Sequence, residues 1–158
     1  MNTYPEQAKA YTEALKLGAV SLNDLVEWAD TVIANEVEPT YEFIKLSLCK
    51  KDSDALAHLE LISENANEER SFKILFGVLY QELKNGGCAY EDVAKRLYFW
   101  SAYETELNGY GEFVGFWDEL GLAESGQHGD AEQVKSDILA ALQNEPDYIG
   151  KQPHELPY

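Results

Sequence analysis

The fold is decided by residues 67–87, NEERSFKILFGVLYQELKNGG. Four large apolar side chains in this stretch share one face at three- and four-residue spacing: Phe72, Leu75, Phe76 and Leu79. That period is typical of an α-helix with one side packed against a core. The stretch ends in a clear stop signal, Asn85-Gly86-Gly87, because glycine readily adopts the left-handed conformation that follows many helices. The sequence therefore predicts a helix over about residues 67–83.

The same helical period continues on both sides of this stretch, and no convincing period-two pattern of a β-strand appears. Further helices are expected at about residues 5–17, 21–33, 41–49, 52–62, 90–107, 112–120 and 131–142. The apolar residues that mark the helix at 41–49 are Tyr41, Ile44, Leu48 and Cys49. The expected loop before the last helix is glycine-rich, with Gly121, Gly126 and Gly129. The prediction is an all-α fold, a compact irregular domain of about seven or eight helices packed as antiparallel hairpins.

The size of the chain favours one domain. It has 158 residues, and 45% of them are hydrophobic, which is enough for one sizeable core. The last stretch of the sequence contains three of the five prolines. We therefore expect a single helical domain over residues 1–144 and an irregular C-terminal tail over residues 145–158.

The chain is strongly acidic, with 29 acidic and 12 basic residues and a formal net charge of −17. The excess is concentrated in residues 101–158, which hold 12 acidic and 2 basic residues. Such a field repels nucleic acid phosphates and anionic lipid, so we expect neither nucleic acid nor a membrane as a partner. The polar N-terminus has no apolar segment of a secretion signal, and no stretch approaches the length of a membrane span. These features favour a cytoplasmic protein.

The sequence contains no recognisable catalytic or metal-binding motif. Cys49 and Cys88 lack CxxC spacing and are expected to be reduced structural thiols. His58, His128 and His154 fall in three separate segments and give no spacing for zinc ligands. We therefore expect a protein that is not an enzyme, with no catalytic residue, no metal and no cofactor.

A magnesium-dependent helical hydrolase is an alternative, because such enzymes bind the metal through carboxylates on facing helices. The candidate carboxylates are spaced three or four residues apart: Glu27 and Asp30, and Glu60, Glu64 and Glu68. The second set is better explained as a solvated helix face, since the apolar residues of that helix turn a different side to the core.

The most informative functional feature lies between Arg96 and Lys135, where 38 consecutive positions contain no lysine or arginine. Carboxylates and aromatic residues alternate there, so the stretch offers unpaired negative charge beside the side-chain types that anchor protein interfaces. Part of the aromatic set is expected to be core. The predicted partner-binding residues are Tyr103, Glu104, Glu106, Tyr110, Glu112, Trp117, Asp118 and Glu119.

In its size, helical layout, acidity and aromatic-acidic stretch, the chain resembles the small acidic all-α immunity proteins of bacterial toxin systems, including contact-dependent inhibition. The segment from Ser21 to Leu48, with Trp28-Ala29-Asp30 in its middle, is also similar to helical bacterial proteins found in such neighbourhoods. The resemblance has no diagnostic motif and implies no particular site residue. It implies an inhibitor that binds a cognate, basic, nuclease-type toxin domain.

Two further functions fit the sequence. An adaptor or secretion chaperone would bind its client through an apolar groove, so its binding would resist salt. A protein that mimics DNA would share the electrostatics of an immunity protein and differ only in the identity of its partner. The sequence leaves the oligomeric state open.

Overall fold

The computed structural model describes residues 3–104 and 113–143. Within these ranges all regular structure is helical, which confirms the all-α prediction. The elements are α1 (Tyr4–Lys16), α2 (Leu22–Asn35), α3 (Tyr41–Ser47), α4 (Asp52–Ile62), α5 (Glu68–Asn85), α6 (Tyr90–Phe99), the π-helical turn η1 (Trp100–Glu104), α7 (Phe113–Glu124) and α8 (Ala131–Leu142). The expected tail over residues 145–158 lies outside the described residues.

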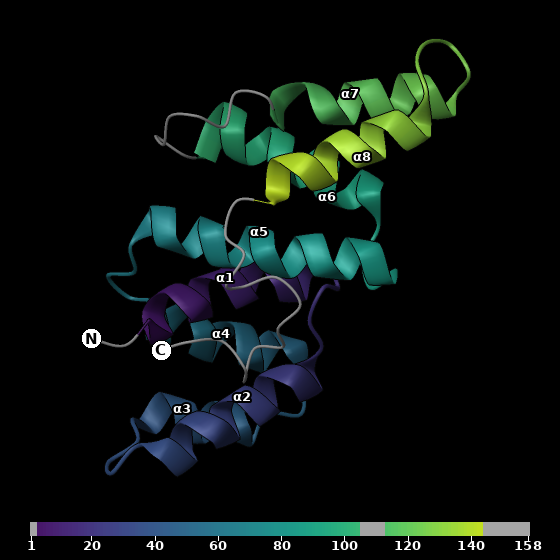
Figure 1. Cartoon of the computed structure of the whole chain (residues 1–158). Helices are drawn as coiled ribbons and strands as arrows, with labels where there is room; N and C mark the ends of the chain where they lie inside the picture. The colour runs from purple at the N-terminus through teal and green to yellow at the C-terminus, as the bar shows by residue number, and fades with distance from the viewer. Residues whose placement is uncertain (1–2, 105–112, 144–158) are drawn as a thin grey trace.

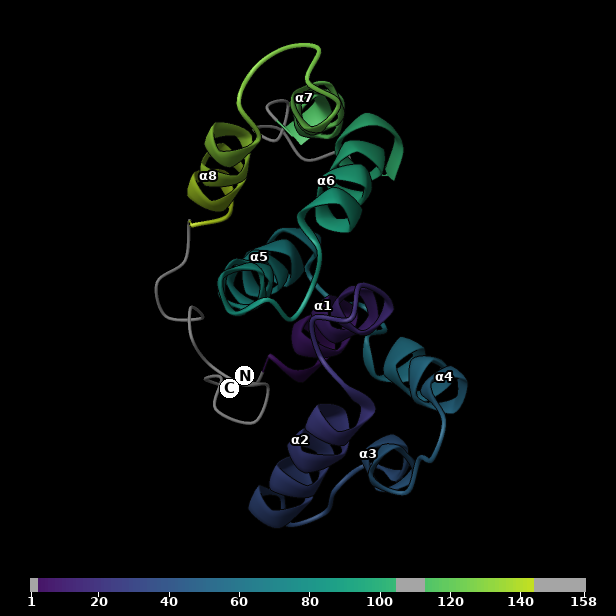
Figure 2. The same ribbon diagram turned by 90° about the vertical axis from the view of Figure 1, so that its right-hand side faces the viewer.

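The helices form a stack, with α2 and α3 at one end and α7 at the other (Figures 1 and 2). In the first half, α2 packs on α3, and α3 packs on α4. In the second half, α6 packs on α7, and α8 contacts both α7 and α5. The two halves meet at α1, which lies in the middle of the stack and packs on both α4 and α5.

Local capping signals set several helix boundaries. The Ser21 hydroxyl accepts a hydrogen bond from the Asp24 amide at 3.1 Å, and the Asp24 carboxylate accepts one from the Ser21 amide at 2.9 Å. This reciprocal pair satisfies two amides that the first turn of α2 leaves open. At the start of α5, the Asn67 side chain accepts from the Arg70 amide at 2.9 Å. At its end, Gly86 has the left-handed φ of 79° that the sequence predicts there.

An aromatic cluster holds the first half of the stack together. The Trp28 side chain on α2 is fully buried between Tyr11 of α1 and Phe43 of α3, with ring centroids 4.9 Å and 5.1 Å away. Tyr4 extends the cluster, with its ring 5.3 Å from that of Phe43. Each of these contacts is edge-to-face, an arrangement in which aromatic pairs attract beyond their burial.

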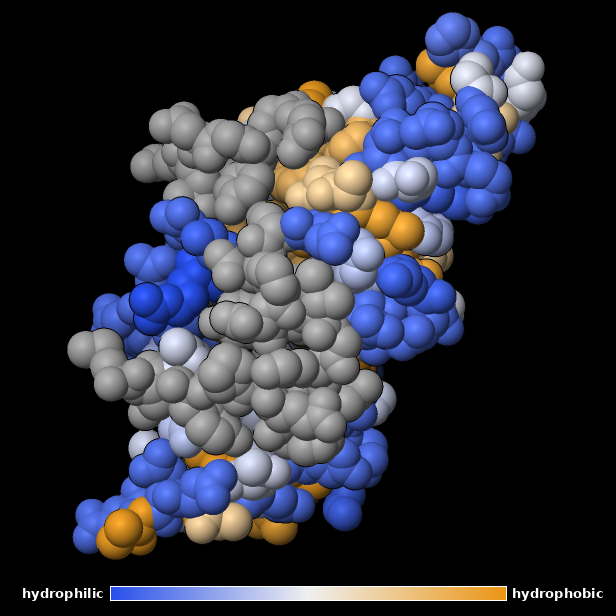
Figure 3. Space-filling model, in the orientation of Figure 1, coloured by the Kyte–Doolittle hydropathy of each residue, from blue (hydrophilic) through white to orange (hydrophobic). Residues whose placement is uncertain are grey.

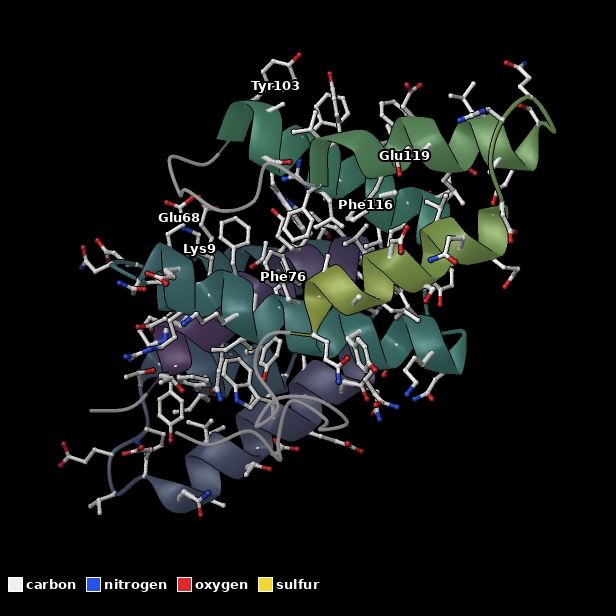
Figure 4. The ribbon with its side chains drawn as sticks, turned by 45° about the horizontal axis from the view of Figure 1, so that its top comes forward. Lys9, Glu68, Phe76, Tyr103, Phe116 and Glu119 are labelled. Atoms are coloured by element: carbon white, nitrogen blue, oxygen red, sulfur yellow. The ribbon has the colours of Figure 1, made fainter. Side chains whose placement is uncertain are left out.

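A second aromatic cluster positions α7 on the rest of the molecule, and we call it the inner aromatic cluster. Its five members are Phe72, Phe76, Trp100, Phe113 and Phe116. On α7, Phe113 lies 5.3 Å from Phe76 and 6.1 Å from Phe116, measured between ring centroids. Figure 4 shows Phe76 and Phe116 directed between the helices. This packing anchors one side of α7 and leaves the opposite side facing outward.

Three details of the helices differ from the prediction. Helix α6 ends at Phe99 and passes into the π-helical turn η1, whereas the prediction continued one helix to about residue 107. Helix α3 buries Phe43 and Leu46, whereas Tyr41, Ile44 and Leu48 are exposed by 64%, 40% and 65%. The neighbours α2 and α4 therefore select a different face of α3 from the one that its apolar residues mark. Helix α7 extends to Glu124 and contains Gly121, which the prediction placed in a loop. Its burial of Phe113, Phe116 and Leu120 outweighs the low helix propensity of glycine.

Candidate functional site

The structure brings part of the predicted binding set to one end of the stack. Tyr103 lies on η1 at the end of α6, and Trp117, Asp118 and Glu119 lie on α7. Three further members of the predicted set fall outside the described residues: Glu106, Tyr110 and Glu112. The side chain of Glu104 is likewise outside the description. The site is therefore built from α6, η1 and α7.

Four aromatic side chains pack together on the outer side of α6 and α7, and we call them the outer aromatic cluster: Tyr98, Phe99, Tyr103 and Trp117. The Trp117 ring lies 5.6 Å from Tyr98 and 6.0 Å from Phe99 between centroids. Tyr103 lies 6.1 Å from both Tyr98 and Phe99. Tyr103 is 71% exposed and points away from the molecule in Figure 4, whereas the other three are half-buried.

The π-helical turn explains why Tyr103 joins this cluster. Hydrogen bonds in a π-helix join residues five apart, so the turn is wider than that of an α-helix. Tyr98 and Tyr103 are five residues apart, and their hydroxyl oxygens lie 3.5 Å from each other. At the same point, the Ser101 hydroxyl donates to the Leu97 carbonyl at 2.5 Å, competing with the helix's own backbone bonds. The turn therefore directs Trp100 to the inner cluster and Tyr103 to the outer one.

A hydrogen bond and the ammonium of Lys95 both contact the outer aromatic cluster. The hydrogen bond with Tyr103 is the main reason that the pKa of Tyr98 is raised above its ordinary value. The Lys95 ammonium lies 5.6 Å from the centroid of the Trp117 ring, where the π face attracts a positive charge. The sequence window from Arg96 to Lys135 did not reveal this cation, because Lys95 lies just before the window and reaches it through the fold.

A groove of about 800 Å³ runs along the outward side of α7 beside Tyr98. Four of its lining residues recur at four-, three- and four-residue spacing along one side of α7 and the turn after it, and we call them the groove floor: Val114, Asp118, Gly121 and Ser125. The rest of its lining is Tyr98, Gly115, Trp117, Leu122 and Gln127. The groove therefore combines an aromatic wall, a floor with small side chains and one carboxylate.

Glu119 lies on a different side of α7 from Asp118. It lines a separate hollow of about 600 Å³ with Phe116 of α7 and with Asp137, Ala140 and Ala141 of α8. Because adjacent residues on an α-helix point about 100° apart, one flat partner cannot contact Asp118 and Glu119 equally. The predicted binding set is thus divided between the groove and the α7–α8 hollow, and Figure 4 shows Glu119 on α7 well away from Tyr103.

Most carboxylates of this end of the molecule are unpaired. Within residues 3–104 and 113–143, no salt bridge reaches Asp118, Glu119 or Glu124, and all three are exposed. Glu132 is an exception, because the Lys135 ammonium lies 3.5 Å from its carboxylate, so the expectation that no local salt bridge forms was wrong there. Figure 3 shows hydrophilic residues over the ends of α7 and α8 that lie near the loop between them, and hydrophobic residues over the C-terminal end of α8. The end of the stack formed by α7 therefore carries a negative field with little internal compensation.

Among the described residues, the thiols and His58 have environments that do not favour catalysis or metal binding. Burial, with Glu82 and Asp92 nearby, raises the pKa of the Cys88 thiol to about 12, and burial followed by Asp54 raises that of Cys49. Both thiols are therefore poor nucleophiles at neutral pH. His58 is half-buried on α4 and contacts Glu42 of α3, with 2.7 Å between Nδ1 and the carboxylate oxygen. No group of three or more histidine, cysteine, aspartate or glutamate side chains with metal-binding geometry occurs in the described part of the chain.

Comparison with known proteins gives no match to a family model, to a curated protein or to a solved structure. None of the helices in the described ranges combines the length and the apolar character needed to cross a membrane.

Sequence reasoning identified Trp117 and Asp118 but missed the groove in which they lie. Tyr98 belongs to the aromatic stretch, yet only the fold shows that it faces Trp117 across two helices. Gly121 and Ser125 were missed because the sequence placed the end of this helix at residue 120. A helical wheel extended to Glu124 would have placed Val114, Asp118 and Gly121 on one face.

Proposed function

We propose that this chain is an immunity-type inhibitor that binds a basic protein domain through the outward side of α7 and the end of α6. The observation that supports this proposal is the position of Asp118, an exposed carboxylate in a groove lined by Tyr98 and Trp117, with no salt bridge to any residue in 3–104 or 113–143. Aromatic side chains beside an uncompensated charge supply both an anchor and a steering field. The partner is then a cationic surface with aromatic or apolar groups at its centre.

The mechanism of such an inhibitor is occlusion. A toxin domain that cleaves nucleic acid holds a cationic groove for its phosphates, and an acidic protein face competes for the same groove. The net charge of −17 attracts a basic domain over distances of about 10 Å at moderate salt. Association is then fast, and it slows as salt screens the field.

The first test is affinity capture of the tagged chain from its native cells, followed by expression of the captured protein alone and with this chain. We expect one stoichiometric basic partner that arrests growth when it is expressed alone and is neutralised by co-expression. Capture of a non-toxic acidic or neutral partner would contradict the inhibitor proposal, as would growth arrest that co-expression does not relieve. A nucleic-acid-binding factor as the partner would instead favour the DNA-mimic alternative.

Charge-reversal variants on α7 test whether the partner binds the outward side of this helix. Asp118→Lys and Glu119→Lys, made singly and together, are compared with the double variant Glu60→Lys/Glu64→Lys at the end of α4, far from α7 (Figures 1 and 2). We expect the α7 double variant to slow association with the captured partner about 10-fold or more at low salt. The α4 variant changes the net charge equally and should have a much smaller effect. Equal effects of both double variants would show that only the overall charge matters.

An adaptor or chaperone is the second candidate, and the exposed side of α3 favours it. Tyr41, Ile44 and Leu48 form an apolar stripe on that helix, exposed by 64%, 40% and 65%. Binding through this stripe would change little with salt concentration, because salt screens interactions between charges and not the burial of apolar surface. Loss of partner binding in Ile44→Ser/Leu48→Ser, together with full binding by Asp118→Lys/Glu119→Lys, would favour the adaptor.

A further inference from the structure

The fold of the free protein gives no reason for a glycine at position 121 in the α7 groove. It lies inside a helix and is exposed, and its φ is not in the left-handed region that favours glycine. A Cβ atom added there would meet no heavy atom within 4 Å, so no internal contact requires a glycine. Glycine in a helix costs about 0.5 to 1 kcal/mol relative to alanine. The protein therefore carries a destabilising residue in the floor of an open groove.

The groove has the dimensions and the chemistry of a helix-packing site. Val114 and Ser125, at the two ends of its floor, are 11 positions apart in the sequence, or about 16 Å along the axis of α7. Small residues on one helix allow the axis of a second helix to approach toward the lower end of the usual 8–10 Å range. Gly121 and Ser125 supply such a surface, and Trp117 with Leu122 supply the apolar flanks.

The charge in the groove indicates which kind of segment can bind there. Asp118 is the carboxylate that lines the groove, and it has no salt bridge within the described residues. A second copy of this chain would bring its own Asp118 against this one, which Coulomb repulsion disfavours. A peptide that binds by adding a β-strand would need an open sheet edge for its backbone hydrogen bonds, and residues 3–104 and 113–143 form no strand.

We propose that the α7 groove takes an amphipathic α-helix of the basic partner, about three turns long, whose small or apolar face packs on Gly121 and whose lysine or arginine side chain pairs with Asp118. This inference rests on the proposed function, because it names the segment of the partner that the acidic end of the molecule binds. Trp117 and Tyr98 form the wall against which the apolar face of that helix packs.

The test is selection of binders from a displayed library of random 16-residue peptides against the native chain. We expect the selected peptides to be cationic, to show apolar residues at three- and four-residue spacing, and to become helical on binding. Gly121→Leu should weaken their binding at least 10-fold, because its side chain fills the groove floor. The matched control is Ala57→Leu, which adds the same side chain to an exposed helical position on α4. Peptides that are acidic or extended, that bind Gly121→Leu as well as the native chain, or that fail to emerge would overturn the groove proposal.

Gly121→Ala gives a second test of the groove, because the small alanine side chain should not disturb the fold as leucine could. In the free chain it should raise the melting temperature by about 2 to 4 °C, because alanine is the better helix former and nothing obstructs its Cβ. In the same variant, binding of the selected peptides should weaken. A variant that is more stable and binds equally well would exclude close helix packing at Gly121.

The outcomes for the groove and for the proposed function are separable. If a basic toxic partner is captured and Asp118→Lys/Glu119→Lys slows its association, the inhibitor proposal stands. If Gly121→Leu then leaves that association unchanged, only the groove inference fails. If selected helices bind the groove but the captured partner is not neutralised, the groove stands and the inhibitor proposal fails.

Discussion

Glu82 on α5 shows how a single carboxylate can set a pH dependence. Burial, followed by the nearby charge of Asp24, raises the pKa of Glu82 above its ordinary value of 4.5. A raised folded-state pKa means that the folded chain holds this proton more tightly than the unfolded chain. The stabilising contribution is therefore complete below the ordinary value and is lost as the pH rises through the raised folded-state pKa.

We accordingly expect Glu82→Gln to increase the free energy of unfolding at pH 7, because glutamine stays neutral. The gain should shrink as the pH falls through the raised folded-state pKa toward 4.5. Urea unfolding at several pH values measures this gain in the free energy of unfolding. Glu60→Gln, an exposed carboxylate on α4, is the matched control and should show no comparable pH-dependent gain. A gain for Glu82→Gln that does not change with pH would contradict this account.

At the residue scale, the sequence predicted local helix signals better than the tertiary surroundings of each side chain. Gly86 acts through neighbours within a few residues, so its role in ending α5 was visible before the fold was known. Tyr98 and Trp117 are 19 positions apart, and whether such aromatic residues face a core or a groove depends on how two helices cross. Composition alone could not separate the inner aromatic cluster from the outer one.

At the scale of elements, one ion pair joins helices that are remote in sequence. The guanidinium of Arg96 on α6 donates two hydrogen bonds to the carboxylate of Glu13 on α1, each 3.1 Å long. The same guanidinium lies 5.0 Å from the centroid of the Trp100 ring. This contact ties the central helix α1 directly to the half of the molecule that contains the groove.

We expect Arg96→Lys to lower the free energy of unfolding by about 1 to 2 kcal/mol, because lysine keeps the charge and loses the two-pronged geometry. Chemical denaturation measures this loss. The comparison is Lys135→Ala, which breaks a pair whose glutamate side chain is 83% exposed and removes an ammonium 5.5 Å from the centroid of the Tyr90 ring. It should change stability by less than about 1 kcal/mol. Equal losses in the two variants would show that geometry contributes nothing to the Arg96 pair.

Helices were predictable where several signals agreed. Helix α5 combines a cap, a long apolar face and a glycine stop, and its predicted range was nearly right. Helix α3 has only seven residues, so two turns leave the choice of buried face to α2 and α4. Helix α7 continued past its predicted end because buried aromatic contacts, which are tertiary, outweighed the propensity of Gly121.

At the scale of the whole molecule, charge is the dominant property. A net charge of −17 makes the folded chain repel itself, and the unpaired carboxylates of α7 contribute to this repulsion. We expect the melting temperature to rise by several degrees between about 20 mM and about 500 mM sodium chloride, since salt screens repulsion between exposed charges. Scanning calorimetry measures the change.

The variant Asp118→Lys/Glu119→Lys provides the comparison for this effect. Each replacement changes the charge by two units, so the net charge becomes −13. The variant should melt at a higher temperature than the native chain at low salt and should respond less to added salt. An unchanged salt response would place the repulsion elsewhere in the molecule.

The central position of α1 has a consequence for how the chain is made. The helix is synthesised early, yet it packs on both α4 and α5. After α4 has left the ribosome, the side of α1 that meets α5 stays uncovered until about 20 more residues have been translated, which takes about 1 to 4 s. During that interval a chaperone or a second nascent chain can reach an apolar surface that the finished protein hides. Translation speed across α5 is therefore expected to influence the yield of folded protein.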